Sequence, residues 1–110
     1  MLLFYLSLIE SEEDKSKFTQ LYNTYKKRML NYAIKFMGTD TDAEDIVAET
    51  FIRIINHIDS VEEVDSSKTE NYVFTILKHI CINHLIWRLY FHAPHPQLSN
   101  LNFYHIPLLY

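Results

Sequence analysis

Glycine and proline are almost missing from the first 93 residues of this chain. Gly38 is the only glycine, and Pro94, Pro96 and Pro107 are the only prolines. Proline breaks helices, and glycine-rich loops of the GxxxxGK[ST] and GxGxxG kinds cradle phosphates. Their scarcity excludes such loops and makes a nucleotide-binding α/β fold improbable. The expected fold is all-α.

Size and composition indicate one compact domain. The chain has 110 residues, 48% of them hydrophobic, and a net charge of −4 that argues against a general nucleic-acid coat. Cys81 is the single cysteine, so no internal disulfide forms and a reducing cytoplasm is the expected location. The apolar residues 1–9 are too short for a membrane span and lack a preceding basic residue. They are expected to form a short helix docked on the core.

Two segments with helical periodicity follow. The first begins its apolar repeat at Phe18, and Gly38 is expected to cap its C-terminal end. The second is predicted to open with a capping box formed by Thr41 and Glu44. Its predicted buried stripe is Ala43, Ile46, Val47, Phe51, Ile54, Ile55 and Ile58.

A third long helix is predicted from a second capping box, Ser67 with Glu70, to about Leu89. It is apolar around most of its circumference, which favours a central place in the bundle. We therefore expect three long helices plus a short N-terminal one, with residues 1–88 forming the helical domain. Residues 89–110 contain no Asp, Glu, Lys or Arg and form an atypical apolar tail, one that could pair two copies of the chain.

A ridge of polar side chains, interrupted by one isoleucine, lies opposite the buried stripe of the second helix: Asp42, Asp45, Glu49, Ile52 and Asn56. Three carboxylates on one helix face suit a basic partner helix. The alternative is a solubilising face that carries a Glu49 to Arg53 pair worth a few tenths of a kcal/mol, about 0.2–0.5. The pattern by itself favours neither.

Catalytic and metal-binding groups are not recognisable. Cys81 lies on a helix predicted to be buried, where a thiol is usually inert. His79 and His84 are five positions apart, so they diverge on a helix. His92, His95 and His105 lie in the tail, where the alternatives are a surface zinc cluster and unrelated histidines, and the second is the expected one. We expect no enzymatic activity, no metal and no cofactor.

Two runs of residues resemble a known family. Asp42-Ala-Glu-Asp-Ile-Val-Ala-Glu-Thr-Phe-Ile-Arg53, preceded by Phe18-Thr-Gln-Leu-Tyr-Asn-Thr-Tyr25, is similar to region 2 of bacterial sigma factors of the extracytoplasmic-function group. Tyr72-Val-Phe-Thr-Ile-Leu-Lys-His-Ile-Cys-Ile-Asn83 resembles the last helix of that region. Together the matches cover about residues 15–88, and they imply a sigma region 2 bundle that acts in transcription initiation.

The resemblance implies two binding surfaces. In the family, the Asp-Ala-Glu-Asp helix docks on the clamp helices of the RNA polymerase β′ subunit. This implies polymerase contacts by Asp42, Asp45, Glu49, Ile52, Arg53 and Asn56. The last helix and the loop before it melt the promoter −10 element and hold a flipped base. This implies DNA contacts by Lys68, Asn71, Tyr72, Thr75, Lys78, His79, Asn83 and Arg88.

The sequence also departs from the family. His79 and Asn83 replace its usual Asn and Asp, and Ile86 and Trp87 stand where basic residues are common. No counterpart of region 4, the reader of the −35 element, is found, which suggests a truncated or frame-shifted member. The alternative function is therefore a protein-interaction module, a sigma-like decoy that binds polymerase without reading DNA. An anti-sigma factor is a further partner to consider.

Overall fold

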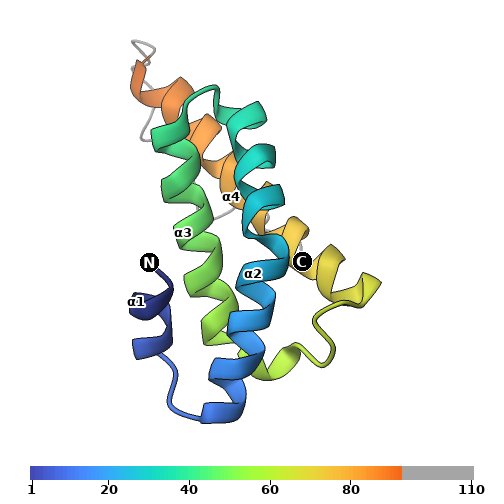
Figure 1. Ribbon diagram of the computed structural model, residues 1–110. Helices are drawn as coiled ribbons and strands as arrows, with labels where there is room; N and C mark the ends of the chain where they lie inside the picture. Colours follow the sequence, from blue (N-terminus) through green and yellow to red (C-terminus); the bar gives the residue numbers. More distant parts are fainter. Residues whose placement is uncertain (93–110) are drawn as a thin grey trace.

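Four α-helices and one short 3-10 helix make up the part of the chain that the computed structural model describes, residues 1–92 (Figure 1). The helices are α1 (Leu2–Ser7), α2 (Glu12–Met37), α3 (Asp40–Asn56) and α4 (Ser67–His92), and η1 (Ile58–Ser60) follows α3. Three of the α-helices are long and one is short, so the all-α prediction is confirmed.

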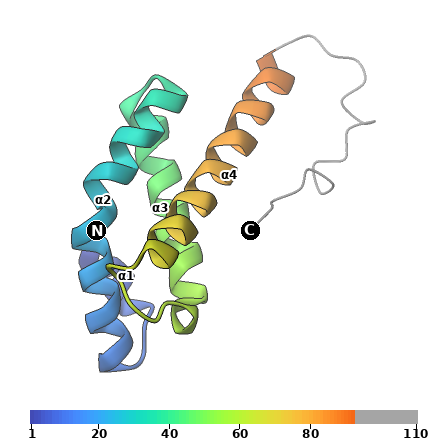
Figure 2. The same ribbon diagram turned by 90° about the vertical axis from the view of Figure 1, so that its right-hand side faces the viewer.

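Helices α2 and α3 form an antiparallel hairpin, and the other two helices pack against it. Figure 2 shows α4 crossing this pair obliquely. In Figure 1, α1 lies beside the half of α3 that is farther from the α2–α3 turn. The helices therefore enclose one core, with α3 contacting each of the other three.

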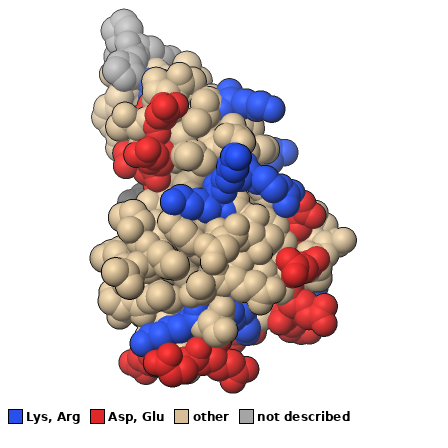
Figure 3. Space-filling view, in the orientation of Figure 1, with Lys and Arg blue, Asp and Glu red and all other residues tan. Residues whose placement is uncertain are grey.

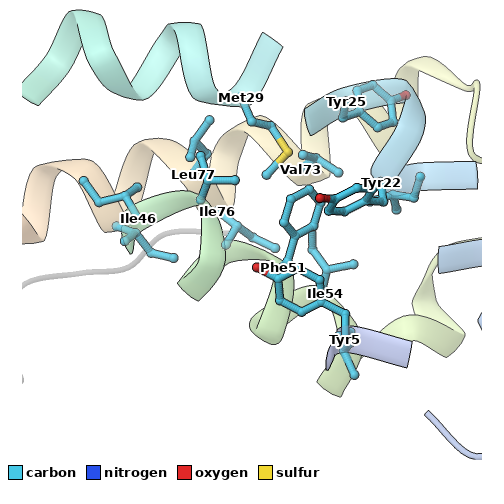
Figure 4. Packing of buried hydrophobic residues seen from close by; sticks show 14 of the residues in the cluster. Tyr5, Tyr22, Tyr25, Met29, Ile46, Phe51, Ile54, Val73, Ile76 and Leu77 are labelled. Carbon is cyan, nitrogen blue, oxygen red and sulfur yellow. The ribbon is translucent and has the colours of Figure 1, made fainter. Parts of the chain in front are cut away.

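The core is centred on Phe51 of α3, a side chain that is 1% exposed. Its ring centroid lies 5.1 Å from that of Tyr22, 5.4 Å from Tyr5 and 5.6 Å from Phe18 (Figure 4). Every residue of the stripe predicted for this helix is buried, so the helical periodicity identified the core face correctly.

Helix α1 is anchored mainly by Tyr5, while Leu2 and Leu6 pack more loosely against the same core. Tyr5 is 2% exposed, and its ring packs against Phe18, Tyr22 and Phe51. The expected docking of a short N-terminal helix is thereby confirmed. Most of the other apolar side chains of the segment face outward, as Leu3, Phe4 and Leu8 do.

The turn between α2 and α3 depends on Gly38, which has φ +79° and donates its amide to the Ile34 carbonyl at 2.7 Å. The predicted C-terminal cap is confirmed. The predicted capping box at Thr41 is wrong, because the N-cap is Thr39. Thr39 is the first extended residue after the glycine, and its hydroxyl accepts a hydrogen bond from the Asp42 amide at 3.4 Å.

Helix α4 also begins one residue away from its predicted cap. The Thr69 amide donates a hydrogen bond of 3.1 Å to the hydroxyl of Ser66, so the N-cap is Ser66 and not Ser67. Glu70 does not complete a capping box with Ser67, because its carboxylate pairs with Arg28 of α2. A contact with the neighbouring helix thus takes the place of the local one.

The far end of α4 leaves the core. The helix continues to His92, past the predicted end near Leu89, and Trp87, Leu89 and Phe91 are all at least half exposed. The prediction of a central helix therefore holds only for the first part of α4, where Val73, Ile76, Leu77, Ile80 and Cys81 are buried. Residues 93–110, most of the predicted apolar tail, lie outside the described residues.

Replacing Gly38 with alanine is expected to lower the free energy of unfolding by about 1–2 kcal/mol. An added Cβ would meet no atom within 4 Å, so the cost comes from the positive φ alone. Thermal unfolding followed by circular dichroism measures the change. Gly38→Asn is the control and should cost less, since asparagine tolerates this conformation better. Equal stability of Gly38→Ala and the unaltered chain would contradict the assignment.

Candidate functional site

The outer side of α3 presents the ridge that the sequence predicts. Asp45, Glu49, Ile52 and Asn56 are exposed, because they lie opposite a stripe that faces the core. Ile52 is 38% exposed, which leaves an apolar side chain between polar neighbours. Figure 3 shows acidic side chains gathered over the N-terminal part of α3, away from a band of Lys and Arg across the middle of this face.

Asp42 differs from the rest of the ridge because another helix binds it. Its carboxylate pairs with the guanidinium of Arg88 on α4, and both side chains are partly buried. The same guanidinium donates a hydrogen bond to the Met37 carbonyl at 3.3 Å. A residue predicted to contact polymerase and one predicted to contact DNA therefore contact each other and fasten α4 to the α2–α3 turn.

One more contact joins the ridge to α4. The Glu49 carboxylate lies 3.4 Å from Nε2 of His84, with both side chains roughly half exposed.

Burial lowers the pKa of His79, and the nearby cations of Lys78 and Arg53 lower it further. His79 is therefore neutral at pH 7, so it can donate and accept hydrogen bonds but brings no charge to the surface.

The polar side chains predicted on α4 divide between two levels of burial. Lys68, Asn71 and Lys78 are exposed. Tyr72, Thr75, His79, Asn83 and Arg88 are partly buried. The Oδ1 atom of Asn83 is buried and has no hydrogen-bond partner among the described residues. The polar side chains of α4 therefore form two rows. One row is exposed, and the other is more enclosed and lies toward the neighbouring helices.

A pocket of about 420 Å³ lies beside the first turn of α4. One wall belongs to α4, and the other belongs to the segment that precedes it. The lining side chains are Ser60, Val61, Glu62, Glu63, Ser66, Lys68, Thr69 and Tyr72. Lys68, Tyr72 and the preceding loop were predicted site elements, and the structure brings them together here. Pockets of this size accept small ligands or single groups of larger ones.

A hydrogen-bond network behind this pocket was missed by sequence reasoning. The Tyr25 hydroxyl donates to the Val64 carbonyl at 2.6 Å, and the Arg28 guanidinium lies over the rings of Tyr25 and Phe74 while it pairs with Glu70. Helical spacing identified Tyr25 only as a core residue. No local pattern predicts a hydrogen bond between residues 39 positions apart.

A second hollow was also missed, at the junction of α1, α2 and α3. Its volume is about 390 Å³, and it is lined by Met1, Tyr5, Tyr22, Lys26, Leu30, Glu44, Asp45, Val47, Ala48 and Phe51. This hollow combines an apolar floor with a charged rim because Tyr5 holds α1 against the α2–α3 hairpin. The sequence pattern of α3 does not reveal that α1 packs at this position. Asp45 belongs to both this hollow and the ridge.

The site offers little catalytic chemistry. Among residues 1–92, no group of three or more His, Cys, Asp or Glu side chains is arranged to hold a metal ion. In the same part of the chain, no helix is long and apolar enough to cross a membrane. His92 ends α4, while His95 and His105 lie outside the described residues.

The buried thiol of Cys81 is expected to react slowly with iodoacetamide at pH 8. Burial raises its pKa to about 11, and each unit lowers the thiolate fraction roughly tenfold. Alkylation should be at least about tenfold slower in the folded chain than in urea, as measured by mass spectrometry. The same shift stabilises the fold below pH 9 and loses that contribution as pH rises toward 11. Equal rates in both states would contradict the assignment of Cys81 as an inert core residue.

Comparison with known proteins identifies a family for the central part of the chain. The family described as Sigma-70 region 2 matches residues 21–86, which is more than half of the chain. Neither the curated proteins nor the solved structures gave a match. The matched segment begins within α2, contains α3 and η1, and ends within α4. It therefore includes the ridge, both walls of the pocket and most of the predicted site residues.

Proposed function

The chain belongs to the sigma-70 region 2 family, and from that premise we propose that it binds the β′ clamp helices of RNA polymerase and captures a base of the promoter −10 element. The family acts in transcription initiation through polymerase core and promoter, and it is not enzymatic. The two proposed contacts use different elements: α3 for polymerase, and the start of α4 with its preceding loop for DNA.

The proposed polymerase contact is supported by the composition of the α3 ridge. Asp45 and Glu49 offer two exposed carboxylates, and Ile52 offers an apolar side chain between them and Asn56. A partner helix with basic residues around an apolar centre would complement this pattern. Arg53 is partly buried beside the ridge, whereas Asp42 would contribute through its contact with Arg88.

The proposed DNA contact is carried by one observation, the pocket between the loop and the first turn of α4. Capture of an unstacked base needs an enclosed space with an aromatic or apolar wall and hydrogen-bonding groups at its edge. Tyr72, Val61, Ser66 and Thr69 supply such groups around a volume of about 420 Å³. Lys68 lies at the same pocket, where an ammonium group would attract a phosphate.

The other polar side chains of α4 would lie along the path of the DNA strand that leaves the pocket. Asn71 and Lys78 are exposed, and Thr75, His79 and Asn83 line the more enclosed side. Hydrogen-bonding groups dominate over cations, so polymerase is expected to supply much of the binding energy. We also place the chain in the extracytoplasmic-function group, on the strength of the runs at residues 42–53 and 72–83.

Single-stranded DNA binding tests the proposal. The probes are fluorescent thymine nonamers that carry A, C, G or T at the central position, with and without bacterial core polymerase. Anisotropy should show a preference for one central base of about tenfold, since a base in a pocket is discriminated by roughly 1–3 kcal/mol. The preference should strengthen with core polymerase. Equal affinity for all four probes under both conditions would contradict base capture.

The decoy function is the second candidate, and one contact favours it. Arg88, a cation predicted to hold DNA, is occupied by Asp42 and by the Met37 carbonyl. This leaves Lys68 and Lys78 as the exposed cations among the predicted DNA contacts. A chain that binds core polymerase in the same assay but shows no base preference would be such a decoy.

A further inference from the structure

The segment that forms the outer wall of the pocket is fixed from two sides. Its side chains Val61 and Val64 are 2% and 5% exposed. From α2, the Tyr25 hydroxyl donates to the Val64 carbonyl at 2.6 Å in a buried contact. From the first turn of α4, the Thr69 hydroxyl donates a hydrogen bond to the Glu63 carbonyl, and Ser66, the residue before the helix, donates to the same oxygen at 2.9 Å.

These hydrogen bonds hold the backbone of the segment that forms one wall of the pocket. The wall that they hold contributes Val61, Glu62 and Glu63, while the facing wall contributes Lys68 and Tyr72. The Thr69 bond joins the loop to the helix that it faces, and the Ser66 bond lies within the loop. Tyr25 is the anchor that joins the loop backbone to a different helix, α2, by a hydrogen bond, in addition to the burial of Val61 and Val64 in the core.

The Tyr25 ring is itself held firmly. The Arg28 guanidinium lies 5.5 Å from the Tyr25 ring centre and 5.1 Å from that of Phe74, and it pairs with Glu70 on α4. The rings of Tyr25 and Phe74 meet edge to face, with centroids 6.3 Å apart. Figure 4 shows the Tyr25 hydroxyl directed away from the centre of the core cluster. The hydroxyl therefore has one fixed direction, toward the loop.

We propose that Tyr25 is a positioning residue for base capture: it holds the loop backbone through Val64 and so fixes the pocket that receives an unstacked base, without touching DNA. The inference rests on the proposed function of the pocket. Burial and the carboxylates of Glu70 and Asp65 raise the pKa of Tyr25 despite the opposing effect of Arg28, so the hydroxyl remains a donor at every physiological pH.

The test compares Tyr25→Phe with Tyr22→Phe in the full chain. Both substitutions remove one hydroxyl from a buried tyrosine of α2 and keep the ring. Tyr22 makes no hydrogen bond to the loop within the described residues, and its ring packs toward Tyr5 and Phe51. A general effect of losing a core hydroxyl would therefore appear in both variants, and an effect on the loop only in Tyr25→Phe.

Hydrogen exchange of the loop amides is the first measurement, and it does not depend on DNA. In Tyr25→Phe, exchange at residues 61–66 should accelerate about tenfold, while exchange in α3 stays unchanged. Tyr22→Phe should leave the loop as it is. If the loop exchanges equally in Tyr25→Phe and the unaltered chain, or accelerates equally in both variants, the positioning role is overturned.

Base discrimination is the second measurement, made with the same four nonamers and core polymerase. Tyr25→Phe should reduce the ratio of best to worst affinity about fivefold or more and leave polymerase binding unaltered. Retained discrimination together with a loosened loop would overturn the inference and leave base capture standing. If the unaltered chain shows no discrimination at all, the proposed function fails and the inference fails with it, whatever the exchange data show.

Discussion

Replacing Phe51 with alanine is expected to lower the free energy of unfolding by about 3–5 kcal/mol, the cost of removing a large aromatic side chain from a packed core. The ring is 1% exposed and is surrounded by the rings of Tyr5, Phe18 and Tyr22, so the cavity would lie where three helices meet. Domains of this size are stable by about 5–15 kcal/mol, so a large part of the total would be lost. Urea unfolding followed by circular dichroism measures the difference.

Phe4→Ala is the matched control. Phe4 is 50% exposed and its ring centroid lies 5.8 Å from that of Tyr5, so its removal leaves no enclosed cavity. Its cost should stay below about 1 kcal/mol. If both variants lost similar stability, or if Phe51→Ala lost less than about 1 kcal/mol, the core would not be centred where the structure places it.

Reversing the charge of Asp45 and Glu49 together should weaken binding to RNA polymerase core at least about 100-fold. Each lysine would replace a proposed attraction by a repulsion, and both positions lie on the solvent side of α3, so the fold should survive. The Glu49 change also removes the contact with His84, but that pair is roughly half exposed and contributes little to stability. Anisotropy of the labelled chain titrated with core polymerase measures the affinity.

The control for this prediction reverses two other exposed carboxylates, Glu10 and Glu13. These side chains lie at the other end of the α2–α3 hairpin from the start of α3. The net charge changes by the same amount as in the α3 variant, so a nonspecific charge effect would weaken both equally. Unchanged binding after reversal at Asp45 and Glu49, with a folded chain by circular dichroism, would remove the proposed polymerase contact.

Much of the fold could be predicted because helix formation and burial leave a periodic trace along the sequence. The stripe from Ala43 to Ile58 and the capping glycine are local features, and both were identified correctly. The caps were misplaced by one or two residues, because Thr39 and Thr41, like Ser66 and Ser67, are equivalent by residue type. Backbone geometry at the turn chooses between them.

The candidate site was predictable only one helix at a time. The exposed ridge of α3 follows from its own periodicity, but the partners of Asp42 and Glu49 come from α4. Pairing of this kind depends on how α4 crosses the hairpin, which no single segment encodes. The hydrogen bond from Tyr25 to Val64 was unpredictable for the same reason, since a spacing pattern reports burial and not the direction of a hydroxyl group.

Helix α1 shows how the order of folding can differ from the order of synthesis. Six residues are too few for a stable isolated helix in water, so α1 depends on its anchor. The anchor, Tyr5, needs Phe18 and Tyr22 of α2 and also Phe51 of α3. During translation, Tyr5 therefore leaves the ribosome well before its binding site exists, because Phe51 lies 46 positions later in the chain.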